Sequence, residues 1–343
     1  MHGGQAQSTT GGSPTALLTA RRGCSGSGYS PRGAASAPGR SALNGITFAW
    51  LEITAECQLV CDHCYADSGP RHGHGRMATQ DWLRVIAQLA AEGVGAVQFI
   101  GGEPMLHPGL PLLMGSALDS GLRVEVFSNL VHVPEDLWPV LQRNGVSLAT
   151  SYYSDEPAEH AAVTGRPSYG RTRANILEAV HRGIPLRAGV IEVRAGQRVT
   201  AAQRELRGLG VRRIGRDRLR QVGRGARDRV PDMSQLCGHC ASGVIAVSPD
   251  GSVWPCVFSR WLPVGNVLAA PLRDILTSPE AQRVREQLAA EFADREIAGA
   301  GKPKPTPCDP KCGPSCGPAC TPSCWPTGTG PCTPKGGCQP NYD

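Results

Sequence analysis

The sequence predicts an α/β protein built on a parallel sheet. Apolar runs of strand length alternate with amphipathic helical patterns between residues 47 and 214, at about 30 residues per unit. Most helical patterns end at a glycine, and 40% of the 343 residues are hydrophobic. That content suffices for a sizeable core, and the alternation is typical of strands joined by right-handed helical crossovers.

Six strands are predicted from short apolar runs bounded by polar loops. The first, TFAWLEIT, reads as a buried strand that ends at a cysteine-containing loop, and VRRI closes the series. The strands are expected at 47–54, 94–100, 123–129, 147–153, 186–193 and 211–214.

Helices are predicted between these strands. In residues 80–93 the side chains of Trp82, Val85, Ile86, Leu89 and Ala90 fall on one helical face, and Gly93 ends the pattern. Four further helices are expected at 110–121, 134–145, 172–183 and 199–210.

Six such units suit either a doubly wound sheet or an incomplete (β/α) barrel, and periodicity does not choose between them. In both, ligands bind at the carboxyl ends of the strands. The loops after the first three strands, AECQLVCDHCYA, GGEP and SNL, are therefore expected to share one mouth.

The two ends differ in composition from the middle. Of the first 46 residues 24 are Gly, Ser or Ala, and 25 of the 43 residues from 301 to 343 are Cys, Pro or Gly. Such segments bury too little apolar surface to offset the entropy of ordering, so both are predicted to be disordered, and the fold is expected at 47–300.

No apolar run is long enough to span a membrane, and no secretory signal pattern is present. The chain is therefore expected in the cytoplasm. Thiols stay reduced there, so the 14 cysteines are read as metal ligands rather than disulfides.

Much of the net charge of +6 is local. Residues 204–229 carry ten arginines against Glu205, Asp217 and Asp228, a local charge of +7. An acidic peptide, a ligand carboxylate or nucleic acid would suit this stretch. A solvated face is the plainer interpretation, and the lack of interleaved aromatic residues argues against nucleic acid.

Three cysteines, Cys57, Cys61 and Cys64, stand in eight residues directly after the first strand. Closed zinc sites and ordinary four-iron clusters take four ligands, so three thiolates indicate a site with one open corner. Two alternatives remain: small buried side chains on one helix face, or zinc with His63 as a fourth ligand, although His63 directly adjoins Cys64.

The second loop, Gly101 to Pro104, reads GGEP. Its glycines allow a backbone to approach a ligand closely, and Glu103 offers a carboxylate to a cation such as an ammonium group. Alone, GGEP is equally consistent with a strand-to-helix turn.

Together, Cx3Cx2C after the first strand and GGEP after the second resemble the radical SAM superfamily over residues 47–230. The resemblance implies a partial (β/α)6 TIM-like barrel. It also implies a [4Fe-4S] cluster on Cys57, Cys61 and Cys64, whose fourth iron is left for S-adenosylmethionine. Reductive cleavage of that cofactor to a 5′-deoxyadenosyl radical, which takes a hydrogen from the substrate, is the implied activity.

The resemblance also implies cofactor contacts. Gly101, Gly102 and Glu103 would take the methionine ammonium, and Ser128 and Asn129 the ribose or methionine moiety. Ser151 and Ile191 are weaker matches. His63 stands where the family often has an aromatic residue, so its ring is expected near the adenine.

A second cysteine set, Cys237, Cys240 and Cys256, surrounds a predicted hairpin with the turn SPDG at 248–251. The spacing Cys240-x10-Gly251-x4-Cys256, continued by VGNV at 264–267, resembles a SPASM or twitch domain. At least one auxiliary iron–sulfur cluster is implied, with a zinc knuckle as the alternative.

The tail departs from the SPASM pattern. Five cysteines from Cys308 to Cys324 recur every four residues, each followed two positions later by proline, so an extended chain is predicted. Cys308 is the expected fourth auxiliary ligand. Thiols without a metal role are the alternative for most of the tail.

The predicted organisation is 1–46 low-complexity, 47–230 radical SAM core, 231–300 auxiliary domain and 301–343 Cys/Pro-rich tail. The predicted function is modification of a ribosomally made precursor peptide by crosslinking or epimerisation. A small-molecule dehydrogenase or epimerase, for a sugar or a cofactor, and an RNA-modifying enzyme are the alternatives.

Two partners are expected besides the peptide. An external electron donor of flavodoxin or ferredoxin type would reduce the cluster. Only 46 low-complexity residues precede the core, so a separate peptide-recognition protein or the basic stretch is expected to bind a leader segment.

Overall fold

The computed structural model describes residues 45–299. The disorder expected at 1–46 and in the tail therefore falls almost entirely outside the described residues, as does the predicted ligand Cys308.

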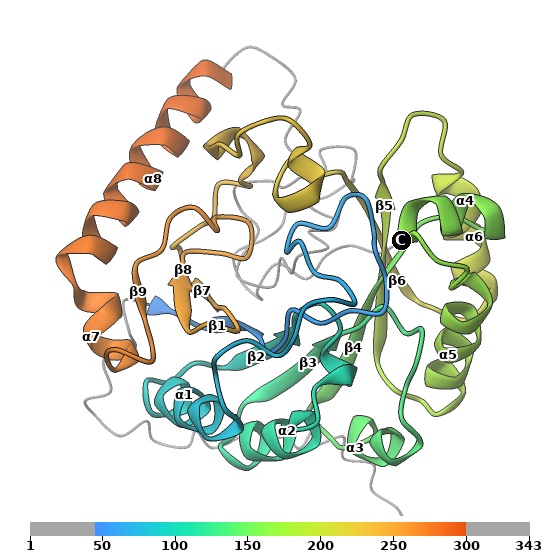
Figure 1. Ribbon diagram of the computed structural model, residues 1–343, viewed down its shortest axis with the longest axis horizontal. Helices are drawn as coiled ribbons and strands as arrows, with labels where there is room; N and C mark the ends of the chain where they lie inside the picture. The colour runs from blue at the N-terminus through green and yellow to red at the C-terminus, as the bar shows by residue number, and fades with distance from the viewer. Residues whose placement is uncertain (1–44, 300–343) are drawn as a thin grey trace, which may run out of the picture. The chain divides into compact units, whose positions relative to one another are not determined.

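One nine-stranded sheet organises the described residues, in the order β6-β5-β4-β3-β2-β1-β7-β8-β9 (Figure 1). Strands β1 to β6 pair in parallel, as the six predicted strands would, although the last one starts two residues later than predicted and continues beyond residue 214. They are β1 (Phe48–Glu52), β2 (Ala96–Ile100), β3 (Arg123–Phe127), β4 (Val146–Tyr152), β5 (Leu186–Glu192) and β6 (Arg213–Arg218).

The sheet is a partial barrel that stays open. A doubly wound sheet would reverse its strand order at a switch point, whereas β1 to β6 follow one another in sequence. Their helices lie along one side of the sheet (Figure 1). Closure would require β6 to pair with β1, but the second edge of β1 is taken by β7.

Seven α-helices lie between Thr79 and Thr277 in the described part of the chain. They are α1 (Thr79–Ala91), α2 (Leu110–Asp119), α3 (Trp138–Leu141), α4 (Pro157–Thr164), α5 (Tyr169–His181), α6 (Val199–Gly208) and α7 (Leu272–Thr277). An eighth, α8 (Pro279–Gly299), follows α7.

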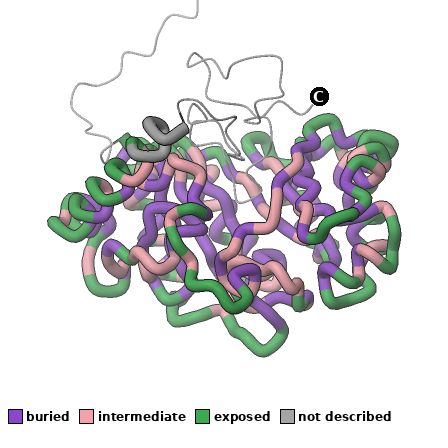
Figure 2. The backbone as a smooth tube through the Cα atoms, turned by 90° about the horizontal axis from the view of Figure 1, so that it is seen from above, coloured by how far each residue is buried: buried purple, intermediate pink, exposed green. Residues whose placement is uncertain are grey.

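Helix α1 shows how the sequence pattern produces its element. Trp82, Val85, Ile86 and Leu89 are buried on one face, as their spacing predicts. The Asp81 carboxylate accepts a hydrogen bond from the Ala78 backbone N–H at 2.9 Å, which satisfies a free donor at the helix start. Figure 2 shows the same separation throughout, with buried backbone inside and exposed backbone at the loops.

Two helices differ from expectation. The helix predicted at 134–145 shrinks to α3, because Pro139 stands in its first turn and cannot donate a backbone hydrogen bond to a preceding turn. Helix α4 was not expected; it begins at Pro157 and ends at Thr164, and the following Gly165 caps it with a φ of +70°, which suits glycine.

The predicted hairpin is confirmed as β7 (Val244–Val247) and β8 (Ser252–Trp254), an antiparallel pair. The two-residue β9 (Gly265–Asn266) pairs with β8. Because β7 also pairs in parallel with β1, the hairpin extends the core sheet. The proposed boundary near residue 230 therefore separates segments of chain that share one sheet.

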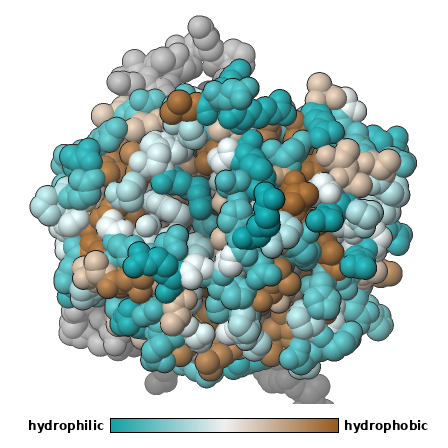
Figure 3. Space-filling model, in the orientation of Figure 1, coloured by the Kyte–Doolittle hydropathy of each residue, from teal (hydrophilic) through white to brown (hydrophobic). Residues whose placement is uncertain are grey.

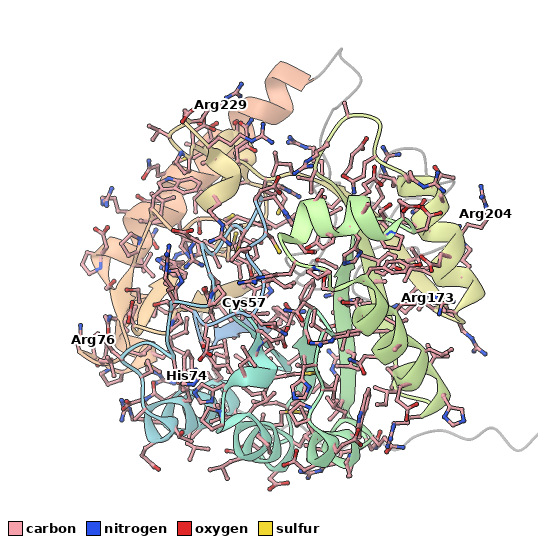
Figure 4. All side chains as sticks on the ribbon, turned by 45° about the vertical axis from the view of Figure 1, so that its right-hand side comes forward. Cys57, His74, Arg76, Arg173, Arg204 and Arg229 are labelled. Atoms are coloured by element: carbon pink, nitrogen blue, oxygen red, sulfur yellow. The ribbon has the colours of Figure 1, made fainter. Side chains whose placement is uncertain are left out.

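The arginines of residues 204–229 do not form one patch. Figure 4 shows Arg204 and Arg229 on opposite sides of the view, and several arginines between them form ion pairs. On the face drawn in Figure 3, hydrophobic side chains occur in small areas separated by hydrophilic ones.

Candidate functional site

The cysteine loop, residues 55–69, follows β1 and folds back on itself. The Cys57 N–H donates to the Gly69 carbonyl at 3.3 Å, and the Gly69 N–H donates to Ala55 at 3.3 Å. No helix forms between Cys57 and Cys64, so the helix-face alternative is wrong. Cys57 is buried, whereas Cys61 and Cys64 are half-buried.

All three thiols line one cavity of about 880 Å³, a volume that includes its opening to solvent. The carboxyl ends of the core strands supply much of the wall, as a parallel sheet predicts. Of the residues predicted to bind a cofactor, the cavity is lined by Gly101, Gly102, Asn129, Ser151 and Ile191. Glu103 and Ser128 lie buried behind this wall.

Gly101 and Gly102 are needed for the packing of two loops. A Cβ at Gly101 would come within 2.3 Å of the Thr54 carbonyl, and one at Gly102 within 2.2 Å of the Glu56 carbonyl. The Gly102 N–H donates to Thr54 at 2.8 Å. The glycines therefore let the second loop bond directly to the base of the cysteine loop, in addition to leaving room in the cavity.

Glu103 is fully buried and ties two strand ends together. Its carboxylate accepts hydrogen bonds from the backbone N–H groups of Asn129, at 2.8 Å, and Met105, at 3.1 Å. Burial nevertheless raises the pKa of this carboxyl to about 7, because desolvation outweighs the hydrogen bonds. Glu103 therefore holds a titratable charge behind the cavity wall.

Asn129 reaches the first cysteine. Its side-chain amide lies 3.6 Å from the Cys57 Sγ as a donor, and the Leu59 backbone N–H lies 3.4 Å from the same sulfur. Gln58 holds the Asn129 amide through bonds in both directions. Donors aimed at sulfur favour a thiolate and tune a metal bound to it.

Ser128, which was predicted to contact the cofactor, lies buried behind the cavity wall. Its hydroxyl accepts from the Leu130 N–H at 2.9 Å and faces the Met105 sulfur at 3.5 Å. The His63 ring, expected near an adenine, packs edge-on against Tyr153 with centroids 5.0 Å apart, and both rings line the cavity.

The donor set fits an iron–sulfur cluster. Burial, followed by the nearby Glu103 charge, raises the pKa of Cys57 to about 12, and burial also raises the pKa of Cys61. Three thiolates here therefore need a strongly positive partner, and a cluster offers each thiolate its own iron. Between residues 45 and 299, no three His, Cys, Asp or Glu side chains converge as a single metal ion requires, so the zinc alternative gains no support.

The auxiliary thiols lie together beside the hairpin. Cys240 and Cys256 are buried and Cys237 is half-buried. A hydrogen bond to Cys256, followed by burial, raises the pKa of Cys240. The Cys256 sulfur also accepts from the Phe258 N–H at 3.3 Å. Cys240 and Cys256 therefore lie within hydrogen-bonding reach of each other, and Cys237 is near enough for its charge to affect Cys240.

Two arginines that sequence reasoning missed join the core to the auxiliary part. Arg260 donates to the fully buried carboxylate of Glu52 at 2.6 and 3.2 Å and stacks on Trp254. Arg220 pairs with Asp217 at 3.3 Å and donates to the Gln235 carbonyl at 3.0 Å. The density of arginines at 204–229 hinted at the link through Arg220, and no sequence signal marked Arg260.

No helix within residues 45–299 is both long and apolar enough to cross a membrane.

Comparisons with known proteins agree with this site. The model of the radical SAM superfamily matches residues 51–192, and that of an iron–sulfur cluster-binding domain, SPASM, matches residues 235–313. The second match extends over Cys308.

Two curated relatives carry the name PqqA peptide cyclase. The protein of Streptomyces rochei is 26% identical over 272 residues, 66% of this chain and 74% of that protein. That of Xanthomonas campestris pv. campestris (strain B100) is 30% identical over 203 residues. The latter match covers 57% of this chain, which spans only about half (53%) of that relative.

Solved structures show the same fold. Streptococcus suis SuiB bound to S-adenosylmethionine matches with a TM-score of 0.59 at 14% identity, covering 71% of this chain and 68% of SuiB. The anSMEcpe protein with bound AdoMet matches with a TM-score of 0.57 at 13% identity, covering 71% and 83%.

The two family matches assign a [4Fe-4S] cluster and S-adenosylmethionine to the core and an auxiliary iron–sulfur cluster to the second part. Residues 51–192 thus match the radical SAM superfamily, residues 235–313 match the SPASM domain that follows it, and the chain is a radical SAM enzyme.

Proposed function

We propose that this enzyme modifies a ribosomally made precursor peptide, by forming a crosslink or by inverting an α-carbon. The observation that carries the proposal is the shared cavity, in which Cys57, Cys61 and Cys64 of the core meet Phe258 of the auxiliary part. The names of the curated relatives support a peptide substrate, and one SuiB structure is of that protein bound to its precursor peptide SuiA.

In this proposal Cys57, Cys61 and Cys64 hold the core cluster, while Cys237, Cys240 and Cys256 hold the auxiliary one with Cys308. When bound, the core cluster and S-adenosylmethionine supply the one-electron chemistry that starts hydrogen-atom removal from the substrate. The protein's part is to bind, to orient and to keep the site dry.

We assign these tasks to residues in and behind the cavity wall. Asn129 orients Cys57 through its amide, and Glu103 supplies negative charge for the methionine ammonium, since two backbone donors use only part of its acceptor capacity. Gly101, Gly102, Ser128, Ser151 and Ile191 complete the proposed cofactor contacts. Apolar side chains exclude water from this wall: Leu59, Ile100, Phe127, Tyr153 and Phe258 line it.

The proposal also includes partner proteins, a cellular location and a division into domains. An electron donor of flavodoxin or ferredoxin type and a separate peptide-recognition protein would act with the enzyme in the cytoplasm. The division into a core of 47–230 and an auxiliary domain of 231–300 also belongs here. Neither a small-molecule substrate nor RNA is favoured by a specific observation, and the dispersed, paired arginines offer no continuous track for a nucleic-acid backbone.

Mass spectrometry of short peptides encoded beside this gene, co-expressed with the full chain, tests the substrate class. Loss of two hydrogens from a peptide indicates a crosslink. Unchanged mass in light water, with deuterium uptake from heavy water, indicates epimerisation. If no neighbouring peptide changes in either way while S-adenosylmethionine is cleaved, the peptide assignment is wrong.

A further inference from the structure

The connector, residues 219–230, links β6 to the auxiliary part, and one of its turns packs against the cysteine loop. The turn, Gly223–Ala226, reads GRGA, and its Arg224 makes four hydrogen bonds to the loop. Nε donates to the Cys61 carbonyl at 2.8 Å, and Nη2 donates to the Ser68 carbonyl at 2.6 Å. Nη1 pairs with the Asp67 carboxylate at 2.8 Å, and the backbone N–H donates to the Cys64 carbonyl at 2.9 Å.

Gly223 and Gly225, on either side of Arg224, allow the turn to approach the cysteine loop this closely. A Cβ at Gly223 would lie 2.4 Å from the Tyr65 carbonyl and 2.5 Å from the Cys64 carbonyl. A Cβ at Gly225 would lie 3.1 Å from the His63 carbonyl. Because any side chain at Gly223 would collide with backbone, the turn lies flush against the loop and only Arg224 reaches into it.

The Arg224 guanidinium is partly buried, and three oxygen atoms of the cysteine loop accept hydrogen bonds from it. Its side chain is 29% exposed, whereas its partner Asp67 is 65% exposed and so neutralises it only in part, through water. A lysine could keep the charge but not this hydrogen-bond geometry, since its single ammonium lacks the planar set of donors. Charge and geometry at this position are therefore separable by substitution.

We propose that Arg224 is a positioning residue for the core cluster: it fixes the carbonyls of Cys61 and Cys64 and places a positive charge beside their thiolates. This inference rests on the proposed role of those cysteines. The connector to the auxiliary part thereby governs both how firmly the core cluster is held and how readily it is reduced, because nearby charge and hydrogen bonding set cluster potentials.

The test compares Arg224→Gln and Arg224→Lys in the full, reconstituted chain, with Arg229→Gln as control. Arg229 lies in the same connector and its substitution removes the same charge, but it donates to the Gln221 side chain, outside the cysteine loop. Iron loss to a chelator, the reduction potential and the electron paramagnetic resonance spectrum of the core cluster are measured for each variant.

Arg224→Gln is expected to lose core iron roughly tenfold faster or more, as the loss of charge-assisted hydrogen bonds implies. The reduction potential of its core cluster should fall, because the positive charge that stabilises the added electron is gone. Arg224→Lys should keep a potential near that of the parent yet lose iron faster. Asp67→Asn, which unmasks the arginine, should shift the potential in the opposite direction from Arg224→Gln.

Equal iron loss and equal potential in the parent and Arg224→Gln overturn the inference, as do equal effects of Arg224→Gln and Arg229→Gln. If Arg224→Gln does not fold, the test rests on Arg224→Lys. Iron loss from Arg224→Lys at the parent rate would then contradict the claim that the hydrogen bonds of Arg224 hold the cysteine loop. A chain with Cys57, Cys61 and Cys64 all changed to Ala separates the two ideas. If that chain keeps its core iron, the cysteine assignment itself has failed.

Discussion

Glu103 should make the binding of S-adenosylmethionine depend on pH. Its carboxyl is wholly buried, and burial raises its pKa to about 7 in the unliganded protein. The proposed ligand group is an ammonium, which binds the ionised carboxylate and not the neutral acid. Lowering the pH through 7 should therefore weaken binding, whereas an ordinary exposed carboxylate would stay ionised over this range.

The magnitude follows from the titration. With a pKa of about 7, the ionised fraction falls from about a half at pH 7 to about a tenth at pH 6. The dissociation constant should then rise about fivefold over that interval. Glu103→Gln should remove the component of the pH dependence that Glu103 causes and weaken binding at pH 7 by roughly ten- to a hundredfold, the loss expected for a charge-assisted hydrogen bond.

Anaerobic equilibrium binding at pH 6 and pH 7 measures both effects in the reconstituted chain. The exposed Glu135→Gln serves as the control. Because the amide of Glu103→Gln turns a donor toward one backbone N–H, a loss of about 1–3 kcal/mol in folding stability is also expected and is followed by denaturant unfolding. Equal pH dependence in the parent and Glu103→Gln would refute the reasoning.

Three further outcomes are expected. Arg260→Met should lower the free energy of unfolding by about 3–5 kcal/mol, since it strands the buried Glu52 carboxylate, and the double change Glu52→Gln with Arg260→Met should cost less; denaturant titration of all three chains distinguishes this from simple loss of packing. Gly102→Ala should abolish S-adenosylmethionine binding, because the new Cβ meets the Glu56 carbonyl at 2.2 Å, and binding at the parent affinity would show that the loops tolerate separation. Truncation before Cys308 should lower iron per chain and reduce peptide modification more than uncoupled cofactor cleavage; unchanged iron, cluster spectra and products would mean that the tail supplies no ligand.

The core of the fold was predictable because its signals are local. Strands β1, β2, β4 and β5 contain short apolar runs, and α1 carries its buried face at helical spacing. Strand β6, RIGRDR, is largely polar, and the apolar signal marked only its beginning. The helix prediction fails where a proline interrupts the apolar period. Residues 134–145 have the spacing of a helix, but Pro139 permits only the short α3. The attachment of β7 to β1 was not predictable, because an edge pairing leaves no mark in the sequence of either strand.

The site was predictable in part for the same reason. Parallel strands place their carboxyl ends at one mouth, so Cys57, Gly101 and Asn129 could be expected there together. The position of Glu103 behind the wall was not apparent, since one of its partners is the backbone N–H of Asn129, in the loop after β3.

Arg224 was counted only as part of a charged stretch. Its contacts lie 156 to 163 residues away in sequence, a separation that composition and spacing do not detect. Long-range side-chain contacts of this kind required the folded chain.

The most direct test of the account is to change Cys57, Cys61 and Cys64 together to Ala. The account predicts that 5′-deoxyadenosine formation from S-adenosylmethionine and dithionite ceases, and that iron falls by about four per chain while some iron stays on the auxiliary site. Undiminished cofactor cleavage by the triple variant, or iron content equal to that of the parent, would contradict it.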